Sequence, residues 1–226
     1  MKPVQRGDFL YGQVLTSLRE FIISGSISRG TVVSAPELAA LLGVSRTPVR
    51  DAVLHLQAEG LVRILPRRGI LVVEPTVADL EDLFRFREPL EGMAAALAAQ
   101  RIDHAGRERL TIAFDQHERA IRGHDLEAHL TEDEDFHEII AQAARSRRIE
   151  QALRDVRNQL RVYTRMLSSK PGAMDDRIVD VHRTITGAIH NGDARAAESA
   201  ARAHVRGVLD LYLENAPDLP EANKYE

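Results

Sequence analysis

The segment from Ser34 to Val53 constrains the fold of this chain most, because it has the pattern of two short helices joined by a tight turn. Its apolar residues recur at helical spacing, first in Leu38, Leu41 and Leu42 and then in Val49, Val53 and Leu56. Gly43 is a natural end for the first helix, and Ser45 is a natural N-cap for the second. We therefore expect a helix-turn-helix unit.

The second of these helices has a polar side that suits DNA. Because Val49 and Val53 face inward, Arg46, Thr47 and Arg50 fall on the opposite, exposed side. Arginine forks match phosphate oxygens and guanine edges, so a first turn with two guanidinium groups and a hydroxyl is suited to enter a major groove. The alternative is an ordinary three-helix domain with arginines on its surface.

The flanking segments favour the DNA-binding interpretation. Two β-rich stretches, 61–65 and 70–73, flank a turn with Arg67 and Arg68 at its tip, which predicts a two-stranded wing with two positive charges. Upstream, a supporting helix that ends near Gly25 is indicated by Leu10, Val14, Leu18, Phe21 and Ile22. Helix, turn, helix and basic wing follow one another in the order that a winged helix-turn-helix requires.

This part of the chain resembles the winged helix-turn-helix of the GntR transcription regulators. The resemblance lies in the runs 43–53 and 59–62 and in Arg68-Gly69. It implies that Arg46 and Arg50 are the main DNA contacts and that Thr47 assists them. It also implies that Gly69 lets the wing backbone approach the minor groove, beside Arg67 and Arg68.

One position departs from the family pattern. Many members have an arginine just before the Glu-Leu that opens the first helix of the pair, and this chain has Pro36 there. We expect that DNA contact to be missing.

Composition sets the outer limits of these expectations. The chain of 226 residues is long enough for two domains, and 44% of its residues are hydrophobic. It has no cysteine, no long apolar stretch and no signal-peptide pattern at its start, so we expect a soluble, cytoplasmic protein without disulfides. The net charge is −4, but residues 1–75 hold nine Lys/Arg against six Asp/Glu, and the remainder holds 21 against 28. A basic N-terminal part is compatible with DNA binding.

A domain boundary is expected near Glu74-Pro75-Thr76, between a DNA-binding domain (1–75) and an all-helical domain (76–226). The predicted fold class is thus mainly α, a winged helix-turn-helix followed by a helical bundle. Six helices are expected at about 77–99, 104–122, 126–144, 146–168, 173–191 and 194–214. Pro89 and Gly92 are expected to kink or divide the first, and the tail after Ala216 is expected to fray.

Polar residues interrupt the apolar faces of three of these helices. Asp133 and His137 replace core residues one turn apart on the third, His182 lies on the apolar face of the fifth, and His204 on that of the sixth. The turn at Asp193 is equally distant from His182 and His204, so antiparallel packing places them at the same height. Three imidazoles and a carboxylate in one cavity suit a divalent ion, most simply zinc, although nickel, manganese or cobalt fits nearly as well.

Two simpler explanations remain open at this point. A histidine within an apolar face is often a hydrogen-bonded core residue, and Asp133 at i, i+4 can simply hold His137. The pattern around Asp133 and His137, with His182 and His204 on later helices, resembles the metal-binding pattern of FCD effector domains, the all-helical C-terminal halves of FadR-type GntR regulators. Ser146 departs from the asparagine of many relatives, but serine also caps helices.

The resemblance to effector domains implies a ligand, a small organic acid that completes the coordination of the metal. Arg87 lies in an otherwise apolar stripe and is a candidate to clamp a carboxylate, with an intrahelical pair to Glu91 as the alternative. Arg161, with Tyr163 nearby, is a second candidate that fits a surface or interface position equally well.

The resulting interpretation is a ligand-responsive transcription regulator, a repressor, that binds a palindromic operator as a homodimer. One alternative is a metal-dependent enzyme with a fused DNA-binding head, in which Glu134, Asp135 or Glu138 would supply a base. Another is a DNA-binding head on a bundle that serves dimerisation alone.

Overall fold

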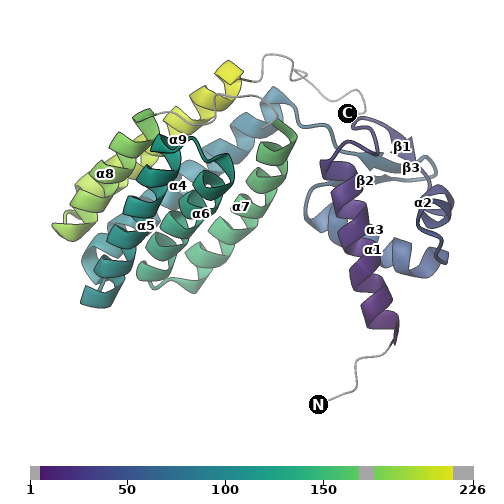
Figure 1. The fold of residues 1–226 in the computed structure, drawn as a ribbon, viewed down its shortest axis with the longest axis horizontal. Coiled ribbons are helices and arrows are strands. Elements are labelled where there is room, and N and C mark those ends of the chain that lie inside the picture. Colours follow the sequence, from purple (N-terminus) through teal and green to yellow (C-terminus); the bar gives the residue numbers. More distant parts are fainter. Residues whose placement is uncertain (1–5, 168–175, 216–226) are drawn as a thin grey trace. The chain divides into compact units, whose positions relative to one another are not determined.

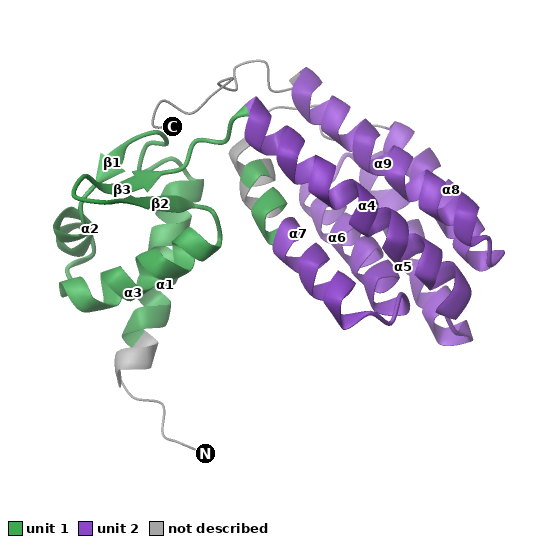
Figure 2. Cartoon of the chain, turned by 180° about the vertical axis from the view of Figure 1, so that it is seen from behind, with its two compact units in different colours: residues 1–76, 158–167, 220–226 green, residues 77–157, 168–219 purple. Residues whose placement is uncertain are grey.

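The computed structural model describes residues 6–167 and 176–215 (Figure 1). Within them the chain forms two compact units, shown in two colours in Figure 2. The first comprises residues 6–76 together with 158–167, and the second comprises 77–157 and 176–215. Each unit has its own hydrophobic core.

The first unit is a three-helix arrangement with a small sheet. Its helices are α1 (Arg6–Ile23), α2 (Ala35–Leu42) and α3 (Arg46–Ala58), and its strands are β1 (Val32–Val33), β2 (Val62–Leu65) and β3 (Gly69–Val72). The strands pair antiparallel in the order β1-β3-β2, with Val62 opposite Val72 and Val32 opposite Leu71. The predicted helix-turn-helix and wing are confirmed, and the predicted wing gains β1 as a third strand.

Local signals in the sequence set the ends of the helix pair. The Ser34 side chain accepts a hydrogen bond from Glu37 N while the Glu37 carboxylate accepts one from Ser34 N, which is a capping box at the start of α2. Gly43 ends α2 in the left-handed region (φ 65°), where glycine lacks the Cβ penalty. Ser45 occupies the N-cap of α3, as expected, but its side chain makes no capping hydrogen bond.

Apolar side chains on the inner faces of the three helices, together with Leu61 just before β2, form the core of the first unit. The fully or almost fully buried members include Leu18, Val49, Ala52, Leu56 and Leu61. Two polar contacts join α1 to the end of α3: the Arg19 guanidinium donates to both Glu59 carboxylate oxygens at 2.9 and 2.6 Å, and Tyr11 Oη lies 2.6 Å from His55 Nδ1. These contacts fix the supporting helix against the helix that bears the predicted DNA face.

The second unit is an all-helical bundle. Its helices are α4 (Val77–Arg101), α5 (His104–Arg122), α6 (Leu126–Ala143), α7 (Arg147–Leu167), α8 (Asp176–His190) and α9 (Ala194–Asn215), the end of α7 lying in the first unit. Helix α4 packs along α9, α5 along α6, and α8 along α9. The predicted mainly helical fold is confirmed within the described residues.

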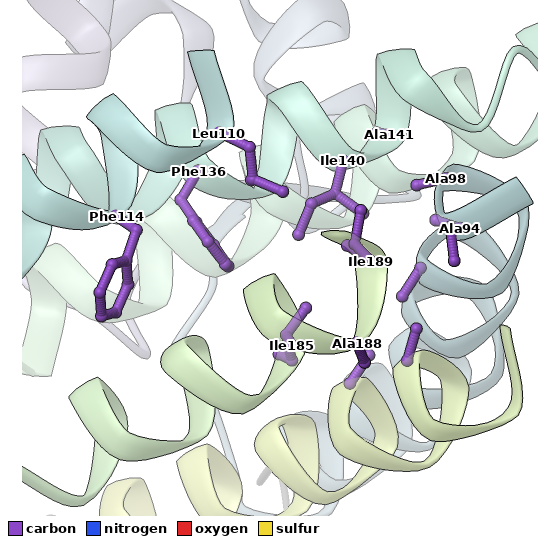
Figure 3. Close-up of a cluster of buried hydrophobic side chains, with 14 of the residues drawn as sticks. Ala94, Ala98, Leu110, Phe114, Phe136, Ile140, Ala141, Ile185, Ala188 and Ile189 are labelled. Carbon is purple, nitrogen blue, oxygen red and sulfur yellow. The ribbon is translucent and has the colours of Figure 1, made fainter. Parts of the chain in front are cut away.

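Small residues let the helices of the bundle approach closely. Figure 3 shows Ala94 and Ala98 of α4 on the side of the buried cluster where Ile140 and Ile189 of neighbouring helices lie, and all four residues are at most 2% exposed. Burying a large apolar side chain contributes about 1.5–3 kcal/mol each. This packed core positions the polar residues that line its interior.

Most predicted helix limits agree with the structure to within two residues. The exception is α8, which begins at Asp176, and the expected start at Ala173 lies outside the described residues, as does the tail after Ala216. Pro89 and Gly92, expected to kink or divide the first helix, do not divide it, because α4 runs from Val77 to Arg101 without a break. Pro89 is exposed, and its missing amide interrupts one hydrogen bond without ending a helix that packs along α9.

Candidate functional site

The first turn of α3 presents the polar face that the sequence predicts. Arg46, Thr47 and Arg50 are exposed, whereas Val49 and Val53 on the other side are at most 3% exposed. Because α3 starts at Arg46, the backbone amides of Arg46 and Thr47 in its first turn have no acceptor within the helix. Cationic side chains together with a helix N-terminus favour phosphate oxygens.

The wing places two more cations at a tight turn. Arg67 and Arg68 are exposed, Arg67 adopts a positive φ of 62°, and Arg68 N donates to Leu65 O to close the turn. Gly69 has φ 125°, and a Cβ there would lie 2.7 Å from Val33 O of β1. The fold itself therefore requires glycine at position 69, a reason that is independent of any approach to DNA.

The helical unit brings together the four residues predicted to hold a metal. Asp133 and His137 come from α6, His182 from α8 and His204 from α9, and one ligand atom from each lies within 4.8 Å of all the others. We call this set the His₃Asp cluster. The three histidines are at most 3% exposed, whereas the Asp133 side chain is 32% exposed. The predicted equal height of His182 and His204 is confirmed by their Nε2 separation of 3.4 Å.

The spacing of the donor atoms fits one small divalent ion. His204 Nε2 lies 3.1 Å from His137 Nε2 and 3.4 Å from His182 Nε2. Two nitrogens bound tetrahedrally at about 2.0–2.1 Å from zinc stand roughly 3.3–3.4 Å apart. Asp133 Oδ1 lies 3.9 Å from His137 Nε2 and 3.8 Å from His182 Nε2.

The protonation states of Asp133, His182 and His204 also suit a cation. Burial lowers the pKa of His182 and of His204 well below the ordinary value, and neighbouring imidazoles lower it further. Burial raises the pKa of Asp133, but its interactions with the surrounding histidines, His137 foremost, outweigh burial and lower it below the ordinary range. Neutral imidazoles and an ionised carboxylate are the forms that bind metal.

A buried ion pair stands behind His137. Glu91 Oε2 lies 3.3 Å from His137 Nδ1, at ion-pair distance but outside hydrogen-bond geometry, and Arg87 Nε donates to Glu91 Oε1 at 3.2 Å. Burial raises the pKa of Glu91, but its electrostatic interactions with His137 and with the Arg87 guanidinium outweigh burial and lower it well below its usual value. A carboxylate facing the outer nitrogen of a ligating histidine orients the ring and raises its basicity.

Arg87 therefore has the intrahelical partner that the sequence left as the alternative to carboxylate binding. The guanidinium engages Glu91 through Nε, so this hydrogen bond does not use Nη1 or Nη2. Arg87 is 5% exposed and pairs with Glu91, whose other carboxylate oxygen lies 3.3 Å from His137 Nδ1, so Arg87 lies beside the cluster. The side chain of Arg161, the second candidate, lies outside the described residues.

Two further histidines lie at the cluster and were not singled out from the sequence. His117 of α5 is fully buried, and its Nδ1 lies 3.0 Å from His182 Nδ1. His129 of α6 is 5% exposed, and its Nδ1 lies 2.8 Å from His117 Nε2. His117 lies in the buried stripe of α5 with Leu110 and Phe114, so a histidine on an apolar face, the signal that identified His182, also marks it.

Two of the acidic residues considered as catalytic bases, Asp135 and Glu138, are directed elsewhere. Glu138 accepts a hydrogen bond from Arg157 Nη1 at 2.7 Å, and Asp135 is exposed. Glu138 is thus engaged in an ion pair with α7.

A winged helix-turn-helix unit followed by a helical bundle with a buried His₃Asp cluster defines a two-domain transcription regulator that binds DNA. The chain belongs to the GntR family: residues 10–72 match the bacterial regulatory proteins of the gntR family, and residues 82–207 match the FCD domain. This agrees with the resemblance drawn from the sequence.

The chain is similar, over most of its length, to known transcription regulators. It is 28% identical to the HTH-type transcriptional regulator YdhC of Bacillus subtilis over 86% of this chain and 87% of that protein. It is 27% identical to the HTH-type transcriptional repressor RspR of Escherichia coli over 88% of this chain and 86% of that protein. Among solved structures, McbR/YncC of E. coli has the same fold, with a TM-score of 0.70, 20% identity and coverage of 91% and 97%.

The family models and the two relatives of known sequence are those of transcription regulators, so the alternative of a metal-dependent enzyme is not supported. Within residues 6–167 and 176–215, no helix combines the length and apolar character needed to span a bilayer.

Proposed function

We propose that this chain is a metabolite-responsive repressor whose helical domain binds a divalent metal and a small organic acid, and whose DNA affinity changes when they bind. The observation that carries the proposal is the His₃Asp cluster, three buried imidazoles and one carboxylate with ligand atoms within 4.8 Å of one another. Its place in a chain that belongs to a DNA-binding family links the site to regulation. The proposed division is a DNA-binding domain over 1–75 and an effector and dimerisation domain over 76–226.

For the operator contacts we assign Arg46, Thr47 and Arg50 to the major groove, and Arg67, Arg68 and Gly69 to the wing. Support comes from the exposure of the five side chains and from the start of α3 at Arg46, which puts Arg46, Thr47 and Arg50 at the N-terminal end of that helix. A bidentate arginine contact with a guanine contributes about 1–3 kcal/mol of discrimination.

For the metal, the donor set of Asp133, His137, His182 and His204 suits zinc, and nickel, manganese or cobalt is compatible because no thiolate biases the choice. When bound, the ion supplies positive charge and a coordination position for a ligand oxygen. Three neutral imidazoles and one carboxylate leave a divalent ion with one unit of positive charge, while Glu91 and Arg87 compensate each other.

That remaining charge supports an anionic effector of the carboxylate class. Arg87 is proposed as the side chain that receives the acid, because it lies beside the cluster and its Nη atoms are not used in the hydrogen bond to Glu91. Arg161 is retained as a second proposed contact.

A homodimer acting on a palindromic operator in the cytoplasm completes the proposal. Phe86 and Met93, two turns apart on the same side of α4, are 56% and 52% exposed. Large exposed apolar side chains at this spacing support a protein interface on α4. Effector and metal would act by population shift, favouring one of two arrangements for which they have different affinities.

The DNA part of the proposal is tested with variants of matched charge. The operator is first selected from random duplexes with the unmodified protein, and binding is measured by mobility shift. R46A and R50A are each expected to weaken binding by about 10–100-fold. R195A removes the same charge from an exposed site in the helical unit and is the control. Equal binding by R50A, R46A and R195A would refute the assigned face.

The sensor part is tested independently of DNA. Zinc content is measured on all variants, and thermal stability is screened with organic acids in the presence and absence of Zn²⁺. We expect normal zinc content in R46A and R50A, none in a His204→Ala variant, and stabilisation by acids only when metal is present. Stabilisation by an acid that is indifferent to the metal would contradict the joint site.

A further inference from the structure

A chain of three imidazoles leads away from the His₃Asp cluster. His182 turns Nε2 toward the other ligands and Nδ1 toward His117, 3.0 Å away. His117 in turn places Nε2 2.8 Å from His129 Nδ1. Both distances lie in the range of hydrogen bonds. These three histidines come from α8, α5 and α6, so three helices contribute to holding the ring of His182.

The surroundings leave these rings little freedom. His182 and His117 are fully buried, and His129 is 5% exposed. His117 and His129 stack with ring centroids 4.9 Å apart, and Phe136 stacks on His182 with centroids 4.3 Å apart. Asp133 Oδ1 is 3.7 Å from His117 Nε2, beyond hydrogen-bond distance, so His129 is the better partner of that nitrogen.

A neutral imidazole has one donor nitrogen and one acceptor nitrogen, which determines the direction of every bond in the chain. If His182 gives its Nε2 lone pair to a metal, its Nδ1 must carry the proton and donate to His117 Nδ1. His117 then carries its proton on Nε2 and donates to His129 Nδ1. Each ring is thereby held in one tautomer.

We propose that His117, itself held by His129, is the positioning residue that fixes the ring orientation and tautomer of the metal ligand His182. The inference rests on the proposed metal site and adds two residues to it. Ligating histidines are ordinarily held by a carboxylate or carbonyl oxygen, and Glu91 faces His137 in this way. His182 instead has a neutral acceptor, which orients the ring without adding negative charge to the site.

The experiment compares two substitutions of nearly equal shape. Asparagine and leucine remove similar volume from His117, but in H117N the amide oxygen can still accept the proton of His182 Nδ1, whereas H117L has no acceptor. The dissociation constant for Zn²⁺ is measured on the full chain by competition with a chelating indicator, together with the number of ions bound. His104 is exposed, so H104L is the control.

We expect H117L to bind Zn²⁺ about 10–100-fold more weakly than the unmodified protein, the range found for outer partners of ligating histidines. H117N and H104L are expected to stay within about threefold, and one ion should bind per chain. The melting temperatures of the metal-free H117L and H117N variants show whether the two substitutions destabilise the packing equally. If H117L does not fold, H129L and H129N form the same pair one link further out, with a smaller expected loss.

Several outcomes would overturn the inference. Zinc affinity of H117L equal to that of H104L would show that His117 does not act on His182. Equal losses in H117L and H117N would assign the effect to packing rather than to the acceptor. Two ions per chain, falling to one in H117L, would make His117 a ligand of a second metal. If the unmodified protein binds no metal, the proposed site fails and the inference fails with it.

Discussion

Acidifying the metal-free protein is expected to destabilise its helical unit, because His117 is fully buried without a charge. Burial lowers the pKa of His117 from 6.5 to about 4. Between these values the unfolded chain binds a proton that the folded chain excludes. The contribution of His117 to the free energy of unfolding is therefore fully present above about pH 6.5, and it is lost as the pH falls toward about 4.

The structure sets the size of the effect. A separation of about 2.5 pKa units at about 1.36 kcal/mol per unit gives ~3 kcal/mol in total. Between about pH 7.5 and pH 5, ~2 kcal/mol of this is lost. His129, His182 and His204 also have lowered pKa values and add in the same direction.

The assay is urea unfolding followed by circular dichroism, in the presence of a chelator, at these two pH values. H117L is compared with H104L, because both remove one histidine but only His117 is buried. The loss of unfolding free energy on acidification should be ~2 kcal/mol smaller in H117L. An equal loss in both variants would refute the reasoning, since it would mean that His117 binds its proton as readily in the folded chain as in the unfolded one.

Three further predictions concern Glu91, added zinc, and a pair of glycines in the first unit. Glu91→Gln removes the carboxylate that faces His137 Nδ1, so zinc affinity should fall by about 10–100-fold in a chelator competition, and an unchanged affinity would contradict the role of Glu91. Adding Zn²⁺ at about 100 times its dissociation constant should stabilise the chelated protein by ~2.7 kcal/mol in urea unfolding, and no stabilisation would count against the site. Gly69→Ala should destabilise the first unit by about 1–3 kcal/mol, because its Cβ would meet Val33 O. Gly12→Ala, at an open helical position, should stabilise that unit by up to ~1 kcal/mol, and similar melting curves for the two variants would sink the steric argument.

Local signals made most of the fold predictable. The 3.6-residue apolar period located all six helices of the bundle, and Gly43 marked the end of α2. Strand β1 was missed because Val32–Val33 is too short to show an alternating pattern, and it forms only by pairing with β3. Pro89 does not divide α4, because packing along α9 sustains the helix through it.

The His₃Asp cluster was predictable in part, because local spacing along the sequence relates two of its histidines. His182 and His204 share one hairpin with a turn midway between them, so sequence spacing is enough to bring them together. His117 lies on α5, and no spacing along the chain relates it to His182 on α8. The sequence likewise left open whether Arg87 pairs with Glu91 or is available to a ligand carboxylate, and the pair with Glu91 became clear only from the packing beside His137.

The sequence by itself determined which faces are buried, where the helices end, and which polar side chains point inward, because these follow from contacts between residues close along the chain. Only the tertiary structure decided that His117 and His129 continue the cluster, that Glu91 stands between Arg87 and His137, and that Gly69 meets β1. Periodicity tells which side of a helix is hidden, but the partner across the interior depends on how separate helices pack.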